Sequence, residues 1–211
     1  MNSENWRIAG DGVELAVYRW GNPQGIPLLL VHGYPDNHHI WLPLIEQLAG
    51  EFQLFAYDVR GCGHSARPAR LRDYQLPHLS RDLQAVIRAV SPDRPVHLLA
   101  HDYGDSVAQE LLARHHEQRA DIGSCVFLNS GLFPESYRML LIQKLLLSRL
   151  GWLVGRSFGR DDLVRNVTQV YGPCTHPSES ALDDCWSLIT SNRGNRILHR
   201  LSAYVPERQT Y

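Results

Sequence analysis

The sequence has little net charge and almost no lysine. Its 21 Lys and Arg residues nearly balance 22 Asp and Glu residues, which leaves a formal net charge of -1 at pH 7, and Lys144 is the only lysine. Proteins that bind nucleic acid or anionic membranes usually carry a clear excess of basic residues. We therefore expect neither nucleic acid nor an anionic membrane as the principal partner of this chain.

Cysteine is sparse, and the N-terminus shows no leader pattern. The four cysteines (Cys62, Cys125, Cys174 and Cys185) form no C-x-x-C pair and no disulfide-framework spacing, which is typical of reduced thiols in a cytosolic protein. Met1 is followed by neither the basic nor the apolar region of a signal peptide. We therefore predict a cytoplasmic protein. We expect no metal site, because no Cys/His cluster has ligand spacing, and we expect no cofactor.

Long hydrophobic runs are also missing. The leucine-rich stretch from Met139 to Val154 is interrupted by polar and basic residues before it reaches the length of a transmembrane helix. We expect no transmembrane span and interpret the stretch as a buried or lid helix, with an interfacial membrane anchor as the alternative.

Strand and helix patterns alternate over the first 130 residues. Strands are expected at residues 6–9, 13–20, 27–31, 52–57, 95–99 and 124–128, and helices at 39–48, 79–90 and 103–115. Asp11-Gly12 predicts a hairpin turn between the first two strands. The alternation predicts an α/β fold with a doubly wound, mostly parallel sheet.

After Asn129 only helical patterns follow. Helices are expected at residues 135–151, 161–170, 178–191 and 195–204. We predict an α/β core over residues 1–130, incomplete at its C-terminal edge, and a helical cap over residues 131–211. Such a cap would cover the carboxyl edge of the sheet, where α/β proteins bind ligands.

The most informative segment runs from Val96 to Ala108. An apolar strand ends at Ala100, and the residues around Asp102 then turn directly into a helix that begins near Tyr103. This small-x-Asp-x-Gly pattern predicts a nucleophile elbow, a strained turn that lifts one side chain above the sheet edge. The lifted residue is Asp102. A carboxylate nucleophile attacks saturated carbon and forms an ester, so a small apolar electrophile such as an epoxide is the expected substrate.

Two further motifs follow predicted strands. In His32-Gly-Tyr-Pro35, glycine allows a tight turn and proline keeps the residue before it out of the α region. That geometry can aim the Tyr34 N–H at a developing oxyanion, and the N–H after the nucleophile, on Tyr103, is the expected second donor. The motif Asp58–Ser65 is rich in glycine, and we interpret it as an architectural turn.

These three motifs, in this order, resemble the α/β-hydrolase superfamily, in its epoxide hydrolase and haloalkane dehalogenase branch. The segments 101–112, 131–135 and 171–182 look like those of the mesoderm-specific transcript protein and its bacterial relatives. The resemblance implies Asp102 as the nucleophile and the amides of Tyr34 and Tyr103 as the oxyanion hole. The supporting motif positions are His32, Gly33, Pro35, His101 and Gly104. Tyr137, Tyr171 and Tyr204 are candidates for contact with the substrate.

The sequence departs from this branch in two ways. Tyr103 stands where dehalogenases and most epoxide hydrolases carry tryptophan, which weakens the dehalogenase interpretation. Asn129, where some relatives carry the catalytic acid, cannot ionise, and no histidine occupies the expected position of the base; His199 is the only late candidate. We therefore expect a truncated form of a longer hydrolase with an exposed sheet edge at residues 124–128. The alternatives are a catalytically silent binding protein and an inactive truncation product. The oligomeric state cannot be read from the sequence.

Overall fold

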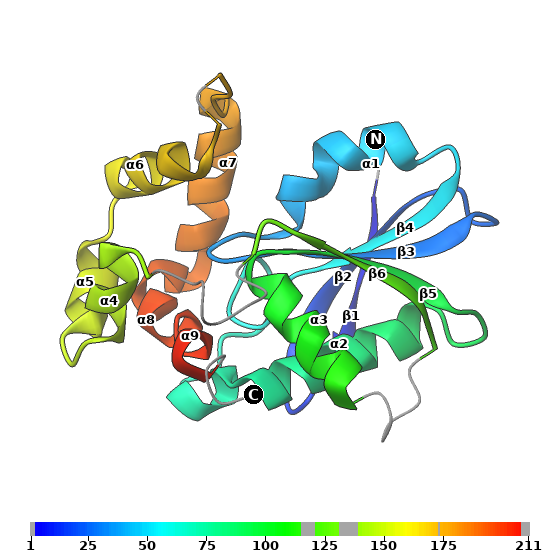
Figure 1. The fold of residues 1–211 in the computed structure, drawn as a ribbon, viewed down its shortest axis with the longest axis horizontal. Helices are drawn as coiled ribbons and strands as arrows, with labels where there is room; N and C mark the ends of the chain where they lie inside the picture. Colours follow the sequence, from blue (N-terminus) through cyan, green and yellow to red (C-terminus); the bar gives the residue numbers. More distant parts are fainter. Residues whose placement is uncertain (1–2, 115–120, 131–138, 173, 208–211) are drawn as a thin grey trace.

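The computed structural model describes residues 3–114, 121–130, 139–172 and 174–207. One six-stranded sheet forms the centre, in the order β1-β2-β4-β3-β5-β6 (Figure 1). The strands are β1 (Glu4–Ala9), β2 (Glu14–Gly21), β3 (Ile26–Val31), β4 (Phe52–Tyr57), β5 (Val96–His101) and β6 (Ile122–Leu128). The pairs β1–β2 and β2–β4 are antiparallel, and the remaining pairs are parallel. The predicted α/β fold with a mostly parallel sheet is confirmed.

Helices cover both faces of this sheet. The short η1 (His38–Trp41) and α1 (Leu42–Leu48) lie on one face, and α2 (Leu76–Val90) and α3 (Tyr103–Arg114) lie on the other (Figure 1). Successive β3 side chains point to opposite faces, so that Leu29 belongs to the core under α2 and α3 and Leu30 to the core under η1 and α1. Burial on both faces explains why β3 reads as a continuous apolar run.

A buried ion pair stabilises the turn after β4. Arg60 is 1% exposed and makes a two-pronged ion pair with Asp82 of α2, with N–O distances of 2.6 and 2.7 Å. Gly61 and Gly63 have φ angles of +88° and +45°, which side chains beyond glycine rarely adopt. The architectural interpretation of this motif is confirmed. A short η2 (Leu71–Tyr74) leads from it to α2.

The helices after β6 pack beside the carboxyl edge of the sheet (Figure 1). They are α4 (Leu141–Leu147), α5 (Gly151–Ser157), α6 (Arg160–Val170), α7 (Glu179–Thr190), η4 (Ser191–Ile197), α8 (Leu198–Leu201) and α9 (Tyr204–Glu207), and we refer to them as the helical block. Their shared apolar core includes Leu146, Ile189 and Leu201 and also takes in Cys62 and Tyr74 from the sheet side. The block is thus joined to the turn after β4.

Two predicted helices of this block differ in the structure. The helix expected to end at Gly151 instead ends at Leu147, and a second helix begins at Gly151 itself, where the Gly151 N–H donates to the Ser148 carbonyl. The helix expected over residues 195–204 is divided among η4, α8 and α9. The periodicity predicted helix correctly, but the loop residues between short helices carry no strong break signal. Residues 131–138 lie outside the described residues.

The leucine-rich stretch is buried on one side only. Leu146 is 3% exposed, as expected for a buried helix, but Leu140, Leu141 and Leu145 are exposed. Full burial is therefore wrong for the outer face, and a lid helix stays a prediction. No helix among the described residues is long and apolar enough to cross a membrane.

Candidate active site

Asp102 sits on a strained turn between β5 and α3. Its φ angle is +50°, a conformation that costs a non-glycine residue on the order of 1–3 kcal/mol. The turn is fixed on both sides, because the Asp102 N–H donates to the Leu128 carbonyl of β6 at 3.1 Å and the Asp105 N–H donates to the Asp102 carbonyl at 3.1 Å. The small-x-Asp-x-Gly pattern therefore forms the sharp strand-to-helix turn that the sequence predicts.

Glycines allow this turn to approach the end of β3. A Cβ atom on Gly104 would lie 2.4 Å from the Val31 carbonyl oxygen, so only glycine lets α3 start this close to β3. A Cβ atom on Gly33 would lie 2.7 Å from the Asp102 Cβ. The two motifs, 70 residues apart in the chain, are thereby brought into direct contact.

The amide of Tyr34 points at the Asp102 carboxylate. The Tyr34 N–H donates a hydrogen bond to Asp102 Oδ2 at 2.9 Å, and the Tyr34–Pro35 peptide bond is cis. Among the described residues, the Asp102 carboxylate accepts no other hydrogen bond and forms no ion pair. One carboxylate oxygen thus accepts a hydrogen bond from the Tyr34 N–H, and the other accepts none from the described residues.

His32 supports this loop and is not a base. Its Nδ1–H donates to the Gly33 carbonyl at 2.8 Å, and its Nε2 accepts from the Val59 N–H at 2.9 Å. Because Nε2 accepts from an amide, the ring is neutral, and complete burial lowers its pKa to about 4. His32 therefore joins the loop that carries Tyr34 to the turn after β4.

Asp58 anchors the same loop from the other side. Its two oxygens accept hydrogen bonds from the N–H and Nδ1 of His38, the N–H of His64 and the hydroxyl of Tyr18, at 2.8 to 3.0 Å. Although burial alone would raise it, the His38 hydrogen bond and charge hold the pKa of this carboxyl well below its usual value. Asp58 is a structural anion in the interior.

The charge of Asp102 contributes to raised pKa values of two further carboxyl groups, those of Asp36 and Asp105. The sequence analysis identified neither residue. Burial, with the Asp102 charge added, raises the pKa of Asp36 to about 7, against a weak hydrogen bond from the Asn37 N–H at 3.3 Å. Burial also raises the pKa of Asp105, which is 0% exposed in the first turn of α3. Asp36 directly follows the His-Gly-Tyr-Pro motif, which is the signal that could have identified it.

The tyrosines that the sequence analysis named differ in how deeply they are buried. Tyr103 is fully buried, and its ring packs on Tyr204 with centroids 4.2 Å apart. Tyr171 is 43% exposed after α6, and Tyr137 lies outside the described residues. The structure thus brings Tyr34, Tyr103 and Tyr204 near the turn at Asp102, but both rings of the Tyr103–Tyr204 pair belong to the main core.

The histidines nearest to the motifs make other contacts. His101 lies edge-on to Trp41, with ring centroids 6.3 Å apart. His199 lies on α8 against α5, where a Cβ atom on Gly151 would lie 3.2 Å from the His199 Cβ, and burial lowers its pKa. Among the described residues, no histidine hydrogen-bonds to the Asp102 carboxylate.

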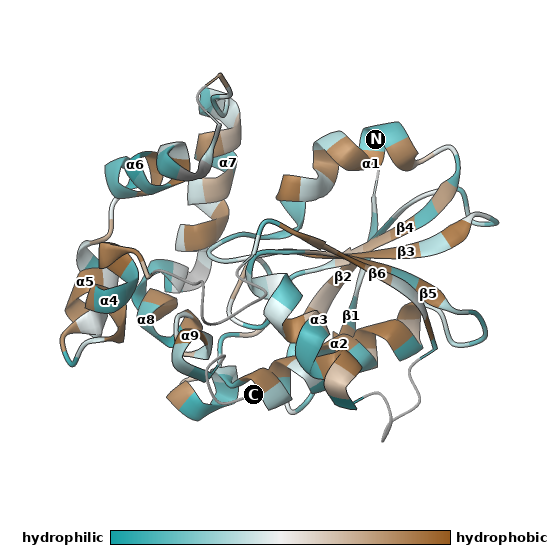
Figure 2. Ribbon diagram, viewed as in Figure 1, coloured by the Kyte–Doolittle hydropathy of each residue, from teal (hydrophilic) through white to brown (hydrophobic). Residues whose placement is uncertain are grey.

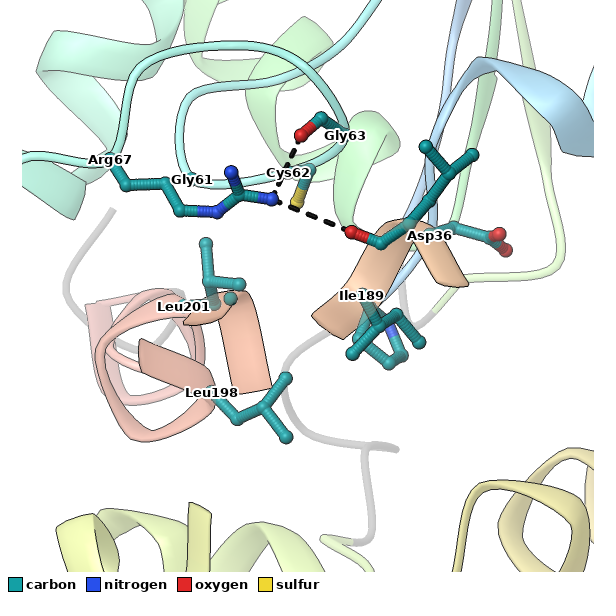
Figure 3. Close-up of a pocket in the computed structure, with 11 residues that line it drawn as sticks. Asp36, Gly61, Cys62, Gly63, Arg67, Ile189, Leu198 and Leu201 are labelled. Carbon is teal, nitrogen blue, oxygen red and sulfur yellow. Dashed lines mark hydrogen bonds between the residues drawn. The ribbon is translucent and has the colours of Figure 1, made fainter. Parts of the chain in front are cut away.

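A small cavity separates the Asp36 loop from the helical block. It is lined by Pro35, Asp36, Gly61, Cys62, Gly63, Arg67, Leu188, Ile189, Gly194, Leu198 and Leu201, and its volume of about 10 Å³ is that of a single water site. Figure 3 shows the Arg67 side chain reaching across toward Gly63 and the end of α7. The Tyr34 hydroxyl donates to the Leu198 carbonyl at 3.2 Å, so the same loop faces Asp102 and the helical block.

A family model described as the alpha/beta hydrolase fold matches residues 26–170. The chain belongs to this family. Among curated relatives of this α/β hydrolase, the mesoderm-specific transcript protein of Mus musculus is 36% identical over 198 residues, which are 90% of this chain and 58% of the mouse protein. The chain therefore spans less than two thirds of that relative.

Solved structures agree on the fold. The structure of Cfl2 from Burkholderia cenocepacia aligns with a TM-score of 0.81 at 20% identity, over 98% of this chain and 72% of that one. The epoxide hydrolase VrEH1 from Vigna radiata aligns with a TM-score of 0.75 at 19% identity, over 97% of this chain and 73% of that one. At these identities the likeness shows the fold alone.

Proposed function

We propose that this α/β hydrolase opens small apolar epoxides, with Asp102 as the nucleophile. The observation that carries the proposal is the contact of the Tyr34 N–H with one oxygen of a carboxylate on a strained turn. A serine hydrolase would need its hydroxyl at this position, whereas a carboxylate there suits displacement at saturated carbon. The likeness to an epoxide hydrolase supports the fold alone, and the substrate class rests on the carboxylate at the turn.

The two oxygens of Asp102 have different tasks in this proposal. The free Oδ1 bonds to an epoxide carbon, the ring C–O bond breaks, and the departing oxygen takes up a proton. In the resulting ester, Oδ2 is the carbonyl oxygen. When water adds to Cγ, negative charge develops on Oδ2, where the Tyr34 N–H already donates and the Tyr103 N–H is proposed as the second donor. Collapse releases the diol and restores the carboxylate.

We further propose that Asp36 moves the protons. A group with a pKa of about 7 can give a proton to the epoxide oxygen and then accept one from the attacking water. After water has added, its remaining proton goes to the leaving alcohol, so that the sum is one epoxide plus one water giving one diol. Contact of the substrate with Tyr137, Tyr171 or Tyr204 remains part of the proposal, as does the role of residues 131–211 as a cap.

A second candidate function is a silent family member that binds a ligand without turnover. The observation that favours it is that no described histidine hydrogen-bonds to the Asp102 carboxylate, so the described residues place no histidine there as a base for water. Formation of a covalent ester distinguishes the two functions, because binding alone leaves the mass of the protein unchanged.

The test is intact-mass analysis after incubation with styrene oxide. We expect the diol to form and, in protein quenched with acid during turnover, the mass to rise by that of one epoxide molecule, with peptide mapping placing the adduct on Asp102. Asp102→Asn should abolish the adduct. Asp93→Asn, a change at an exposed carboxylate, is the matched control and should leave it intact. Equal labelling of wild type and Asp102→Asn, or neither labelling nor diol formation with any epoxide tried, contradicts the proposal.

A further inference from the structure

Apolar side chains gather on the outside of the hairpin formed by α4 and α5. Six of the twelve large apolar side chains exposed in the described chain lie within residues 140–153: Leu140, Leu141, Leu145, Leu150, Trp152 and Leu153. Single exposed apolar residues are ordinary on protein surfaces, but such a concentration marks a site of interaction. We call these six residues the hairpin patch.

The opposite side of the two helices already packs against the core of the helical block, so the hairpin patch is a second apolar surface. Leu146 of α4 is buried, and Ile142 and Val154 pack against the core of the helical block. Gly155 brings α5 close to η4, since a Cβ atom there would lie 3.0 Å from the Asn195 carbonyl oxygen. The inner side of the hairpin is therefore occupied, and the helices are apolar on their outer side as well. Figure 2 shows these two short helices at the edge of the molecule, with hydrophobic segments interrupted by hydrophilic ones.

The charged residues of the segment that carries the patch have one sign. Residues 139–160 contain Lys144, Arg149, Arg156 and Arg160 and no Asp or Glu. Lys144, Arg149 and Arg156 are exposed, and no described carboxylate forms an ion pair with them, whereas Arg160 is paired with Glu179 and Asp183. The net charge of -1 for the whole chain hides this local excess, and it was the net charge that argued against an anionic membrane.

We propose that the α4–α5 hairpin binds the surface of an anionic lipid bilayer. Apolar residues with an exposed tryptophan and a basic rim match the boundary between headgroups and acyl chains. Helices of seven residues are too short to span a bilayer, so they lie on it. In this arrangement Trp152 and the leucines enter the boundary, and Lys144, Arg149 and Arg156 face lipid phosphates.

The test is flotation of the full chain with two kinds of vesicle, pure phosphatidylcholine and phosphatidylcholine mixed with phosphatidylglycerol. We expect binding to the mixed vesicles that weakens as salt is raised. Trp152→Ser combined with Leu153→Ser should weaken it about tenfold or more through lost apolar burial. Arg149→Glu combined with Arg156→Glu should weaken it by a similar factor through lost attraction.

Matched controls lie in the sheet layer away from the hairpin (Figure 1). Ile26→Ser removes an equally exposed apolar side chain at the start of β3, and Arg88→Glu reverses an exposed charge in the last turn of α2; both should bind as wild type does. Unchanged thermal unfolding shows that each variant is folded. Failure of the wild type to float with mixed vesicles overturns the proposal, as does patch-dependent self-association without any vesicle binding.

Discussion

Asp36 and Asp58 show how surroundings decide the behaviour of one residue type. Asp58 accepts four hydrogen bonds, including two from His38, and these keep its pKa low despite burial. Asp36 accepts a weak bond from the Asn37 N–H and lies 4.0 Å from the Cys185 sulfur. With so few donors, burial and the charge of Asp102 raise its pKa to about 7.

The raised pKa of Asp36 predicts a pH-dependent cost in stability. The folded-state pKa of Asp36 lies above the unfolded value near 4, so folding favours the protonated carboxyl. The contribution of this carboxyl to the free energy of unfolding is full below about pH 4 and is lost as the pH rises through 7. Asp36→Asn should therefore stabilise the fold at pH 8 by about 2 kcal/mol, less than the full shift implies because the side chain is partly exposed, and should have little effect at pH 4. Urea denaturation at both values measures this difference.

Asp58→Asn is the control for that experiment. Its carboxylate is stabilised in the fold, so removing the charge should destabilise the protein at pH 8. If Asp36→Asn is equally stabilising at pH 4 and pH 8, the carboxyl does not ionise near neutrality, and its proposed role in proton transfer fails as well.

At the level of elements, Arg67 joins the turn after β4 to the helical block. Its Nη2 donates to the Gly63 carbonyl at 2.8 Å, to Ser191 Oγ at 3.2 Å and to the Leu188 carbonyl at the end of α7 at 3.5 Å. A cation beside the last carbonyls of a helix satisfies acceptors that the helix itself leaves open. The guanidinium lies in the cleft between the two parts, where burial lowers its pKa.

We expect Arg67→Met to loosen this junction. The change keeps much of the apolar stem and removes the donors, so it should lower the free energy of unfolding by about 1–3 kcal/mol. Hydrogen exchange should become faster in α7 and η4 and stay unchanged in β3 and β4. Arg70→Met, at an exposed position, should cost less than about 0.5 kcal/mol. Equal effects of the two substitutions would mean that Arg67 does not join the two parts.

The sequence predicts the sheet better than the helical block. All six strands were expected within a few residues, because short apolar runs and the Asp11-Gly12 turn are local signals. The turn at Asp102 was expected for the same reason. Asp36 and Arg67 were not, since their roles depend on burial between segments far apart in the chain. The division of the block into short helices likewise depends on packing, such as that of Gly155 against η4.

At the level of the whole molecule, β6 is an edge strand of the sheet. Among the described residues no strand pairs with its outer side. The strand carries no charged residue and no proline, and Val126 and Leu128 are 50% and 37% exposed on it. Proteins usually protect such edges with charges, proline or a covering segment. An uncharged apolar edge can instead pair with the same edge of a second copy, by the twofold symmetry common in homodimers.

The 211-residue chain should therefore associate through β6 as its concentration rises. Val126→Lys places a charge at the centre of that contact and should raise the dissociation constant about tenfold, since a buried valine contributes on the order of 1.5 kcal/mol. Sedimentation velocity over a concentration series measures this. Ile26→Lys, at an equally exposed position on the interior strand β3, should associate as wild type does, and Trp152→Ser separates any contribution of the hairpin patch. A wild-type chain that stays monomeric throughout the series, or a Val126→Lys variant that associates unchanged, would show that this edge is protected in a way that the described residues do not provide.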